Sequence, residues 1–199
     1  MSGIVGSINT RGSGITNLGS AADGNVFTGT GAGLPVGFEA AAGGGKILQC
    51  LGTAKTDTQS GSADSWVTVT NLTQAITPAA TSSKVLVMVT LTYHGPISNN
   101  ARFKLVRTAP SLTDICISDA SGSRDPALAM MDRTAATGMQ VAGIIFLDSP
   151  STTSAVTYGI QVRASADTNT WYINTAQTNN DNDNYSRGAS SIVVMEIGA

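Results

Sequence analysis

The sequence predicts an all-β protein: an antiparallel two-sheet jelly-roll sandwich preceded by an extended glycine-rich arm. Three observations support this prediction. Apolar and polar residues alternate in short segments through residues 46–199, turn residues separate those segments, and residues 1–45 hold more than half of the 22 glycines. A parallel α/β fold would need long crossover helices, and the helix-like window at residues 125–134 is too short for that role.

Residues 1–45 are predicted to be an anchoring arm. Their apolar residues have no helical period, so this segment cannot bury enough apolar surface to form a core of its own. The segment is also too apolar for a flexible Gly/Ser linker, and we expect it to become ordered on another molecule. The expected anchoring residues are Ile4, Ile8, Ile15, Leu18, Val26 and Phe27. The Gly43–Gly45 run then precedes an abrupt change of pattern, which predicts a β-sandwich domain over residues 46–199.

The clearest predicted strand covers residues 84–93. Apolar side chains occur there at every second position, so one face should point into the core; these are Val85, Val87, Val89, Leu91 and Tyr93. Further strands are expected at residues 47–52, 65–72, 101–107, 112–118, 139–147, 155–163, 170–174 and 191–197. Strands at this spacing, with turn residues between them, favour a sandwich.

Four side chains within these strands have predicted positions. Cys50 and Cys116 lie in runs that resemble buried strands, so free thiols in the core are favoured over a disulfide. Trp171 and Tyr172 are neighbours in one strand, so their rings must point to opposite faces, one of them inward. The outward ring is a candidate for stacking on a sugar.

Composition and charge exclude several classes of function. Charged residues make up 12% of the chain and the formal net charge is -2, so the sequence offers no basic surface for nucleic acid. No apolar run approaches the ~20 residues of a membrane span, which argues against membrane insertion. The first residues also lack the charged and apolar regions of a secretory signal peptide.

The sequence predicts no enzyme and no cofactor. His94 is the single histidine, so a two-histidine metal site cannot form, and we expect His94 to be a loop residue after the long strand. No G-x-S-x-G elbow is present. Around Lys46, Ala40 replaces the first glycine of a phosphate-binding loop and Ile47 replaces its Ser or Thr. The 13 acidic residues select no pair for glycoside hydrolysis.

Residues 177–188 are the most hydrophilic part of the chain and the predicted receptor loop. The expected recognition residues are Asn182, Asn184 and Tyr185. Asp181 and Asp183 are calcium candidates, because carboxylate and amide oxygens cluster there. They are weak candidates, because Ser186 and Ile192 replace the Gly and Glu that an EF-hand loop requires. The alternative is an exposed polar loop without a metal.

Several runs resemble the virion structural proteins of aquatic bacteriophages. The runs RGSGITNLGS at residues 11–20 and ADGNVFTGTGAGLP at residues 22–35 are similar to their linkers. Residues 146–158, 186–191 and 192–199 resemble their jelly-roll domains. Such proteins resemble the trimeric sandwiches of complement C1q and tumour necrosis factor, so the resemblance implies a homotrimer.

The resemblance implies a protein of the virion surface, assembled in the host cytoplasm. Residues 1–45 would bind the major capsid protein or another virion protein, as in a decoration (cement) protein or a short head fibre. The alternative is a tail fibre or tail appendage whose loops bind a host surface receptor or glycan. A depolymerase is a third reading, and no acid–base pair in the sequence supports it.

Overall fold

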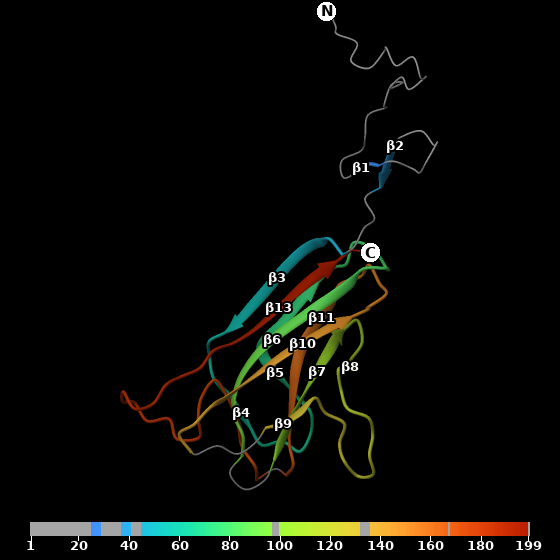
Figure 1. Ribbon diagram of the computed structural model, residues 1–199. Helices are drawn as coiled ribbons and strands as arrows, with labels where there is room; N and C mark the ends of the chain where they lie inside the picture. Colours follow the sequence, from blue (N-terminus) through green and yellow to red (C-terminus); the bar gives the residue numbers. More distant parts are fainter. Residues whose placement is uncertain are drawn as a thin grey trace, which may run out of the picture. The chain divides into compact units, whose positions relative to one another are not determined.

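The computed structural model describes residues 25–28, 37–40, 45–96, 100–131, 136–166 and 168–198 (Figure 1). The chain divides into two compact units, residues 1–44 and 45–199. In the first unit, β1 (Asn25–Thr28) pairs antiparallel with β2 (Gly37–Ala40). Val26 and Phe27 lie in β1, and the other four predicted anchoring residues lie outside the described residues.

In the described part of the second unit, all regular secondary structure is β-strand. The strands are β3 (Ile47–Lys55), β4 (Gln59–Gly61), β5 (Val67–Ile76), β6 (Lys84–His94), β7 (Ala101–Ala109), β8 (Thr113–Ile115), β9 (Ala129–Met131), β10 (Gln140–Asp148), β11 (Val156–Ala164), β12 (Trp171–Ile173) and β13 (Ser190–Ile197). No helix among the described residues is long and apolar enough to cross a membrane.

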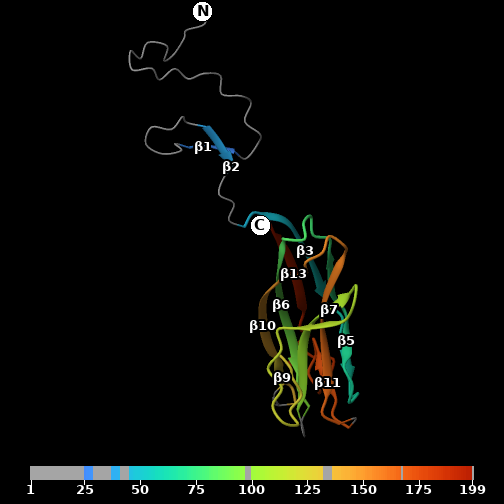
Figure 2. The same ribbon diagram turned by 90° about the vertical axis from the view of Figure 1, so that its right-hand side faces the viewer.

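The strands form two antiparallel sheets that pack face to face (Figure 2). In the first sheet the neighbours run β3-β13-β6-β10, and β12 with β4 continues beside the end of β6. In the second sheet they run β5-β11-β7-β8, and β9 also pairs with β7. If the eight strands of these two rows are counted along the chain, the rows read 1-8-3-6 and 2-7-4-5. This order is that of a jelly roll, so the predicted fold class is confirmed.

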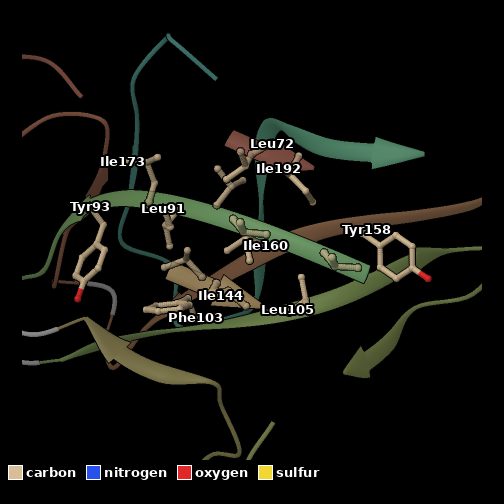
Figure 3. Close-up of a cluster of buried hydrophobic side chains, with 14 of the residues drawn as sticks. Leu72, Leu91, Tyr93, Phe103, Leu105, Ile144, Tyr158, Ile160, Ile173 and Ile192 are labelled. Atoms are coloured by element: carbon tan, nitrogen blue, oxygen red, sulfur yellow. The ribbon is translucent and has the colours of Figure 1, made fainter. Parts of the chain in front are cut away.

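The core lies between the two sheets, where the inward side chains of both meet (Figure 3). The predicted inward face of β6 is confirmed: Val85, Val87 and Leu91 are 0% exposed. The second sheet contributes aromatic and branched side chains from β5, β7 and β11; these include Leu72, Phe103, Leu105, Tyr158 and Ile160. Burial of this apolar surface is the main stabilising contribution to the fold.

One polar cluster also joins the sheets. Asp148, at the end of β10, accepts hydrogen bonds from the Arg107 guanidinium at 2.9 Å and from the Tyr158 hydroxyl at 2.8 Å. Burial, and after it the hydrogen bond to Asp148, raises the pKa of the Tyr158 phenol well above its usual range. The phenol therefore remains protonated and donates to the carboxylate.

All nine strands predicted from the sequence are present, within a few residues at each end. The helix-like window at residues 125–134 contains the strand β9 instead, because Ala129–Met131 pairs with β7. The three-residue strand β4 was not predicted.

Two predicted positions are corrected by the structure. Cys50 is exposed, because its position on β3 is opposite Met195 on the outward side of the sheet; Cys116 is half-buried, and both thiols are free. His94 is the last residue of β6 and fully buried, because the strand continues one residue further to pair with Tyr172 of β12.

Gly61→Ala is expected to destabilise the protein. A Cβ atom at Gly61 would lie 2.6 Å from the indole of the buried Trp171, so the ring or the strand β4 would have to move. Overpacking of this kind costs about 1–3 kcal/mol. Urea denaturation measures the loss, and Gly143→Ala, where a Cβ would meet nothing within 4 Å, is the control. Equal stabilities of the two variants would contradict the prediction.

Candidate functional site

Residues 175–189 join β12 to β13 and are called the recognition loop after their predicted role. The residue before the loop has unusual backbone geometry. Asn174 has a φ of 59°, a left-handed conformation that asparagine tolerates better than most residues. Its side-chain amide donates to the carbonyl oxygens of Lys55 and Asp57, each at 2.9 Å. Its own carbonyl oxygen accepts from the Gly188 backbone N–H at 3.0 Å. Asn174 therefore joins the start of the loop to its end and to β3.

The end of the recognition loop is fixed by a second set of bonds. The Ser190 hydroxyl donates to the Asn174 side-chain oxygen at 2.7 Å and accepts from the Thr92 backbone N–H at 3.0 Å. The Thr92 hydroxyl donates to the Ala189 carbonyl oxygen at 2.7 Å. Gly188 passes so close to the Thr92 side chain that any Cβ would collide with it. Both ends of the loop are thus held on a rigid base, the arrangement that suits a binding loop.

A buried cation supports this base. The Lys55 side chain is 0% exposed, and its ammonium group forms an ion pair with Asp57 at 2.9 Å. The hydrogen bond from Lys55 is the main cause of a lowered pKa at Asp57. The Asn71 side chain donates a further hydrogen bond to the Asp57 carboxylate at 3.3 Å, which lowers this pKa as well. The carboxylate therefore stays ionised at neutral pH and keeps the buried ammonium neutralised.

The recognition loop encloses an open hollow of about 500 Å³. Amide, carboxylate, phenol and guanidinium groups line it: Asn179, Asn180, Asp181, Asn182, Tyr185 and Arg187. Within the loop, Asn182 accepts from the backbone N–H groups of Asn184 at 3.0 Å and Tyr185 at 3.2 Å. Of the three predicted recognition residues, the structure brings Asn182 and Tyr185 into the hollow, and Asn184 supports the turn.

The lining of the hollow offers hydrogen-bond donors and acceptors together with one aromatic ring. Such a set fits a ligand rich in hydroxyl groups, because each hydroxyl both donates and accepts. The outward ring predicted at residues 171 and 172 belongs to Tyr172: Trp171 is 1% exposed and Tyr172 is half-buried. Tyr172 instead meets the His94 ring edge-on, at 5.6 Å between centroids.

His94 has a structural position. Its Nδ1 lies 2.7 Å from the Gly138 carbonyl oxygen, which can only accept, so Nδ1 carries the proton. With the ring fully buried at the end of β6, this bond fixes its orientation.

Asp181 and Asp183 both lie exposed in the recognition loop. Among the residues that the structure describes, no group of three or more His, Cys, Asp or Glu side chains is placed to hold a metal ion. We expect the double variant Asp181→Ala, Asp183→Ala to melt at the wild-type temperature, because neither carboxylate supports the fold. Melting curves with and without millimolar calcium test this, and a calcium-dependent rise that the variant loses would establish a metal site instead.

The recognition loop and the start of the sandwich lie at opposite ends of one strand. β13 begins with Ser190, next to the loop, and Ile197 near its other end pairs with Ile47 of β3. Lys46 accepts a hydrogen bond there from Gly198 at 2.8 Å. From Ser190 to Ile197 the strand rises by seven steps of about 3.4 Å, a distance of about 24 Å. The chain therefore enters the sandwich at the end remote from the hollow.

Glu196 holds this entry end together. Its carboxylate is fully buried and accepts from the Ala79 backbone N–H at 2.7 Å and from the Gln49 amide at 2.6 Å. Burial acts to raise the pKa of Glu196, but the hydrogen bonds, led by that of Gln49, outweigh it and hold the pKa below its ordinary value of 4.5.

Acid is therefore expected to remove the contribution of Glu196 to stability. A carboxyl group whose pKa is lower in the folded state stabilises fully above its unfolded pKa, and this stabilisation disappears as the pH falls through the folded pKa. Melting temperatures of wild type and Glu196→Gln should differ at pH 7 and converge below about pH 4. A constant difference from pH 7 to pH 3 would contradict this assignment.

The outer face of the second sheet carries paired charges. Arg102 and Arg163 both bind Asp125, at 2.9 and 2.8 Å, and Lys104 lies 2.6 Å from Asp114 and 4.3 Å above the Trp66 ring. A second hollow, of about 440 Å³, lies beside them. It is lined by Arg102, Ser118, Asp119, Ser121, Arg124, Asp125, Ala127, Leu128, Ala129 and Met130. Arg102, Arg163 and Lys104 are thus neutralised by aspartates of the same chain.

No protein-family model matches the chain, and no curated protein matches it. Among solved structures, the chain is similar to the infectious bursal disease virus Gt strain structure, with 9% identity and a TM-score of 0.40 over 85% of this chain. It is also similar to the infectious bursal disease virus VP2 subviral particle, with 9% identity and a TM-score of 0.38 over 87% of this chain. In both cases the match covers 44% of the other chain.

Proposed function

We propose that the protein is a structural component of a virus particle, a trimeric decoration protein or short head fibre of a bacteriophage capsid. The N-terminal arm binds the particle, and the sandwich projects outward. The supporting observation is the polarity of the sandwich: the chain enters at one end of β13, and the recognition loop occupies the other end, about 24 Å away. A protein anchored through residues 1–45 would thus hold its loop away from the anchor.

The nature of the two units supports the same proposal. The N-terminal unit has Arg11, Asp23 and Glu39 as its only charged side chains and is rich in glycine, so it suits contact with a protein surface better than exposure to water. The sandwich has the jelly-roll strand order, which recurs in capsid and lectin domains. Because folds host many functions, the strand order supports the proposal only together with the polarity of the sandwich.

A second candidate is a tail fibre or tail appendage that binds a host glycan. The hollow of the recognition loop favours it, because amides, Tyr185 and Arg187 line a space of about 500 Å³ on a fixed base. Such a space accommodates one or two sugar rings. In this role the arm would bind the tail, and the loop would bind the host surface.

Imaging of labelled virus particles distinguishes the two candidates. An antibody against the sandwich, coupled to gold, would be applied to intact particles from the source of the sequence. Label spread over the head supports the decoration role, and label confined to the tail supports the appendage. Particles without label would overturn both.

Co-sedimentation tests the anchoring arm. The double variant Ile15→Asp, Leu18→Asp should lose binding to particles stripped of the protein, because two charges would enter an apolar contact. The double variant Asn182→Ala, Tyr185→Ala, altered in the recognition loop, should still bind. If the arm variant binds like wild type, residues 1–45 are not the anchor.

A further inference from the structure

Three neighbouring rows on the outer face of the first sheet carry no charge across the strands β3, β13, β6 and β10. The register places outward side chains of four strands in continuous rows. One row consists of Ile145, Met88, Val193 and Gly52, and the next consists of Leu147, Leu86, Met195 and Cys50. The third row is small and uncharged, with Gly143, Thr90, Ser191 and Ala54. These twelve residues are called the uncharged face.

Exposed apolar side chains lie on and beside the uncharged face. Nine large hydrophobic side chains are exposed in the described part of the chain, and three of them alternate along the outward side of β10. On β10, Ile145 is 73% exposed, Val141 is 65% exposed and Leu147 is 47% exposed. A contiguous apolar patch of this kind marks an interaction surface in soluble proteins.

The strand β10 is also open along its edge. Among the described strands it pairs with β6 alone, so its second row of backbone N–H and C=O groups faces outward (Figure 2). Natural sheets protect such edges with charged residues or proline, and β10 has neither from Gln140 to Leu147. Asp148, its one charged residue, binds Arg107 and Tyr158 inside the sandwich.

The contrast with the second sheet indicates which partner fits. There the outward side chains Arg102, Lys104 and Arg163 are neutralised by aspartates of their own chain. The uncharged face has no group that could neutralise a charge on a partner, so a charged surface would lose hydration there without compensation. Its partner must be uncharged and flat, and a second copy of the same face meets both conditions.

The area is sufficient for such a contact. Over the eight residues of β13, four strands about 4.8 Å apart that rise about 3.3 Å per residue present an outer side of about 500 Å². The uncharged face is its central part, and Lys84 lies at its margin. Two copies of this outer side would bury about 1,000 Å² in total, which reaches the lower bound for a specific protein interface. The open edge of β10 adds to this area. Contacts between identical surfaces are also the commonest way in which proteins form closed assemblies.

We propose that the uncharged face, with β10 at its margin, is the surface through which copies of this chain associate. The proposal goes beyond the proposed function: contact between two copies of the same face pairs chains two by two, so it is additional to the contacts that build a trimer. It concerns the purified protein and requires no particle. Self-association can therefore be disproved while particle labelling supports the proposed function. Equally, the purified chain can associate while labelling finds no particle location.

Mass measurement by sedimentation equilibrium tests the proposal. The full-length wild type should have the mass of two or more copies at micromolar concentration. Ile145→Glu places a charge in the middle row of the face, on β10, and should weaken association by about 30-fold or more. Because Ile145 is 73% exposed, the single chain should still fold, as unfolding by urea would confirm. Met130→Glu is the matched control, since Met130 is 55% exposed on β9 of the other sheet and should leave the mass unchanged.

A second readout uses the exposed thiol of the face. Mass spectrometry can monitor the rate at which Cys50 is alkylated. This rate should fall by about fivefold or more when the wild type associates, because a desolvated interface excludes the reagent. In Ile145→Glu the rate should not depend on protein concentration. Val141→Lys provides the same test if Ile145→Glu fails to fold. A monomeric wild type, or an Ile145→Glu protein of undiminished mass, would overturn the proposal.

Discussion

Val87→Asp is expected to prevent folding of the sandwich. Val87 is 0% exposed on β6, between β13 and β10, and its side chain lies in the core between the sheets. An aspartate there would bury a charge with no cation in reach, or would have to be protonated at a cost in free energy. A charge without a partner in a core costs at least about 3–5 kcal/mol, a large part of the total stability of a domain.

Circular dichroism and solubility measure this outcome, and the same strand supplies the control. Thr90 lies on β6 but faces outward and is exposed, so Thr90→Asp should fold with stability near that of wild type. It should weaken self-association only. A soluble, cooperatively unfolding Val87→Asp protein would show that the assigned face of β6 is wrong.

Asp148→Ala is expected to lower the free energy of unfolding by about 3 kcal/mol. Asp148 is the acceptor shared by Arg107 of β7 and Tyr158 of β11 in the opposite sheet, so its removal leaves both donors without this acceptor. The Tyr158 hydroxyl is the larger loss, because the side chain is 0% exposed and water cannot replace the carboxylate.

Urea denaturation of single and double variants separates the contributions of this cluster. Asp148→Asn keeps an acceptor oxygen and should cost less than Asp148→Ala. Combining Asp148→Ala with Tyr158→Phe should cost less than the sum of the single losses, because both remove the same hydrogen bond. Asp64→Ala, which breaks the exposed pair with Arg163, should cost at most about 1 kcal/mol. Additive losses for Asp148 and Tyr158 would refute the shared bond.

The sequence was most informative where one face of a strand is buried and the other is solvated. In β6 the alternation is strict, and every second side chain from Val85 to Tyr93 points inward as predicted. In β3 the alternation is absent, because Ile47, Leu48 and Leu51 are apolar and exposed on a strand whose outer side is itself apolar. The pattern therefore could not show that Cys50 faces outward.

The base of the recognition loop could not be predicted for a different reason. The loop itself was evident from its run of Asn and Asp residues, but its fixation depends on partners far away along the chain. Asn174 binds the backbone of Lys55, 119 residues earlier, and Thr92 binds Ser190, 98 residues later. The strand β9 was missed because Ala-Leu-Ala-Met-Met has high helix propensity, which pairing with β7 overrides.

The place of β13 in its sheet has a consequence for how the chain folds during synthesis. The ribosome makes β13 after every other strand, yet β13 lies between β3 and β6 and pairs with both. Until it emerges, β3 lacks a partner among the described strands of its sheet, and one edge of β6 stays open along most of its length. The edges of β3 and β6 must therefore stay available for pairing during synthesis. The first sheet is completed only after residues 190–197 have been translated and β13 pairs with both strands.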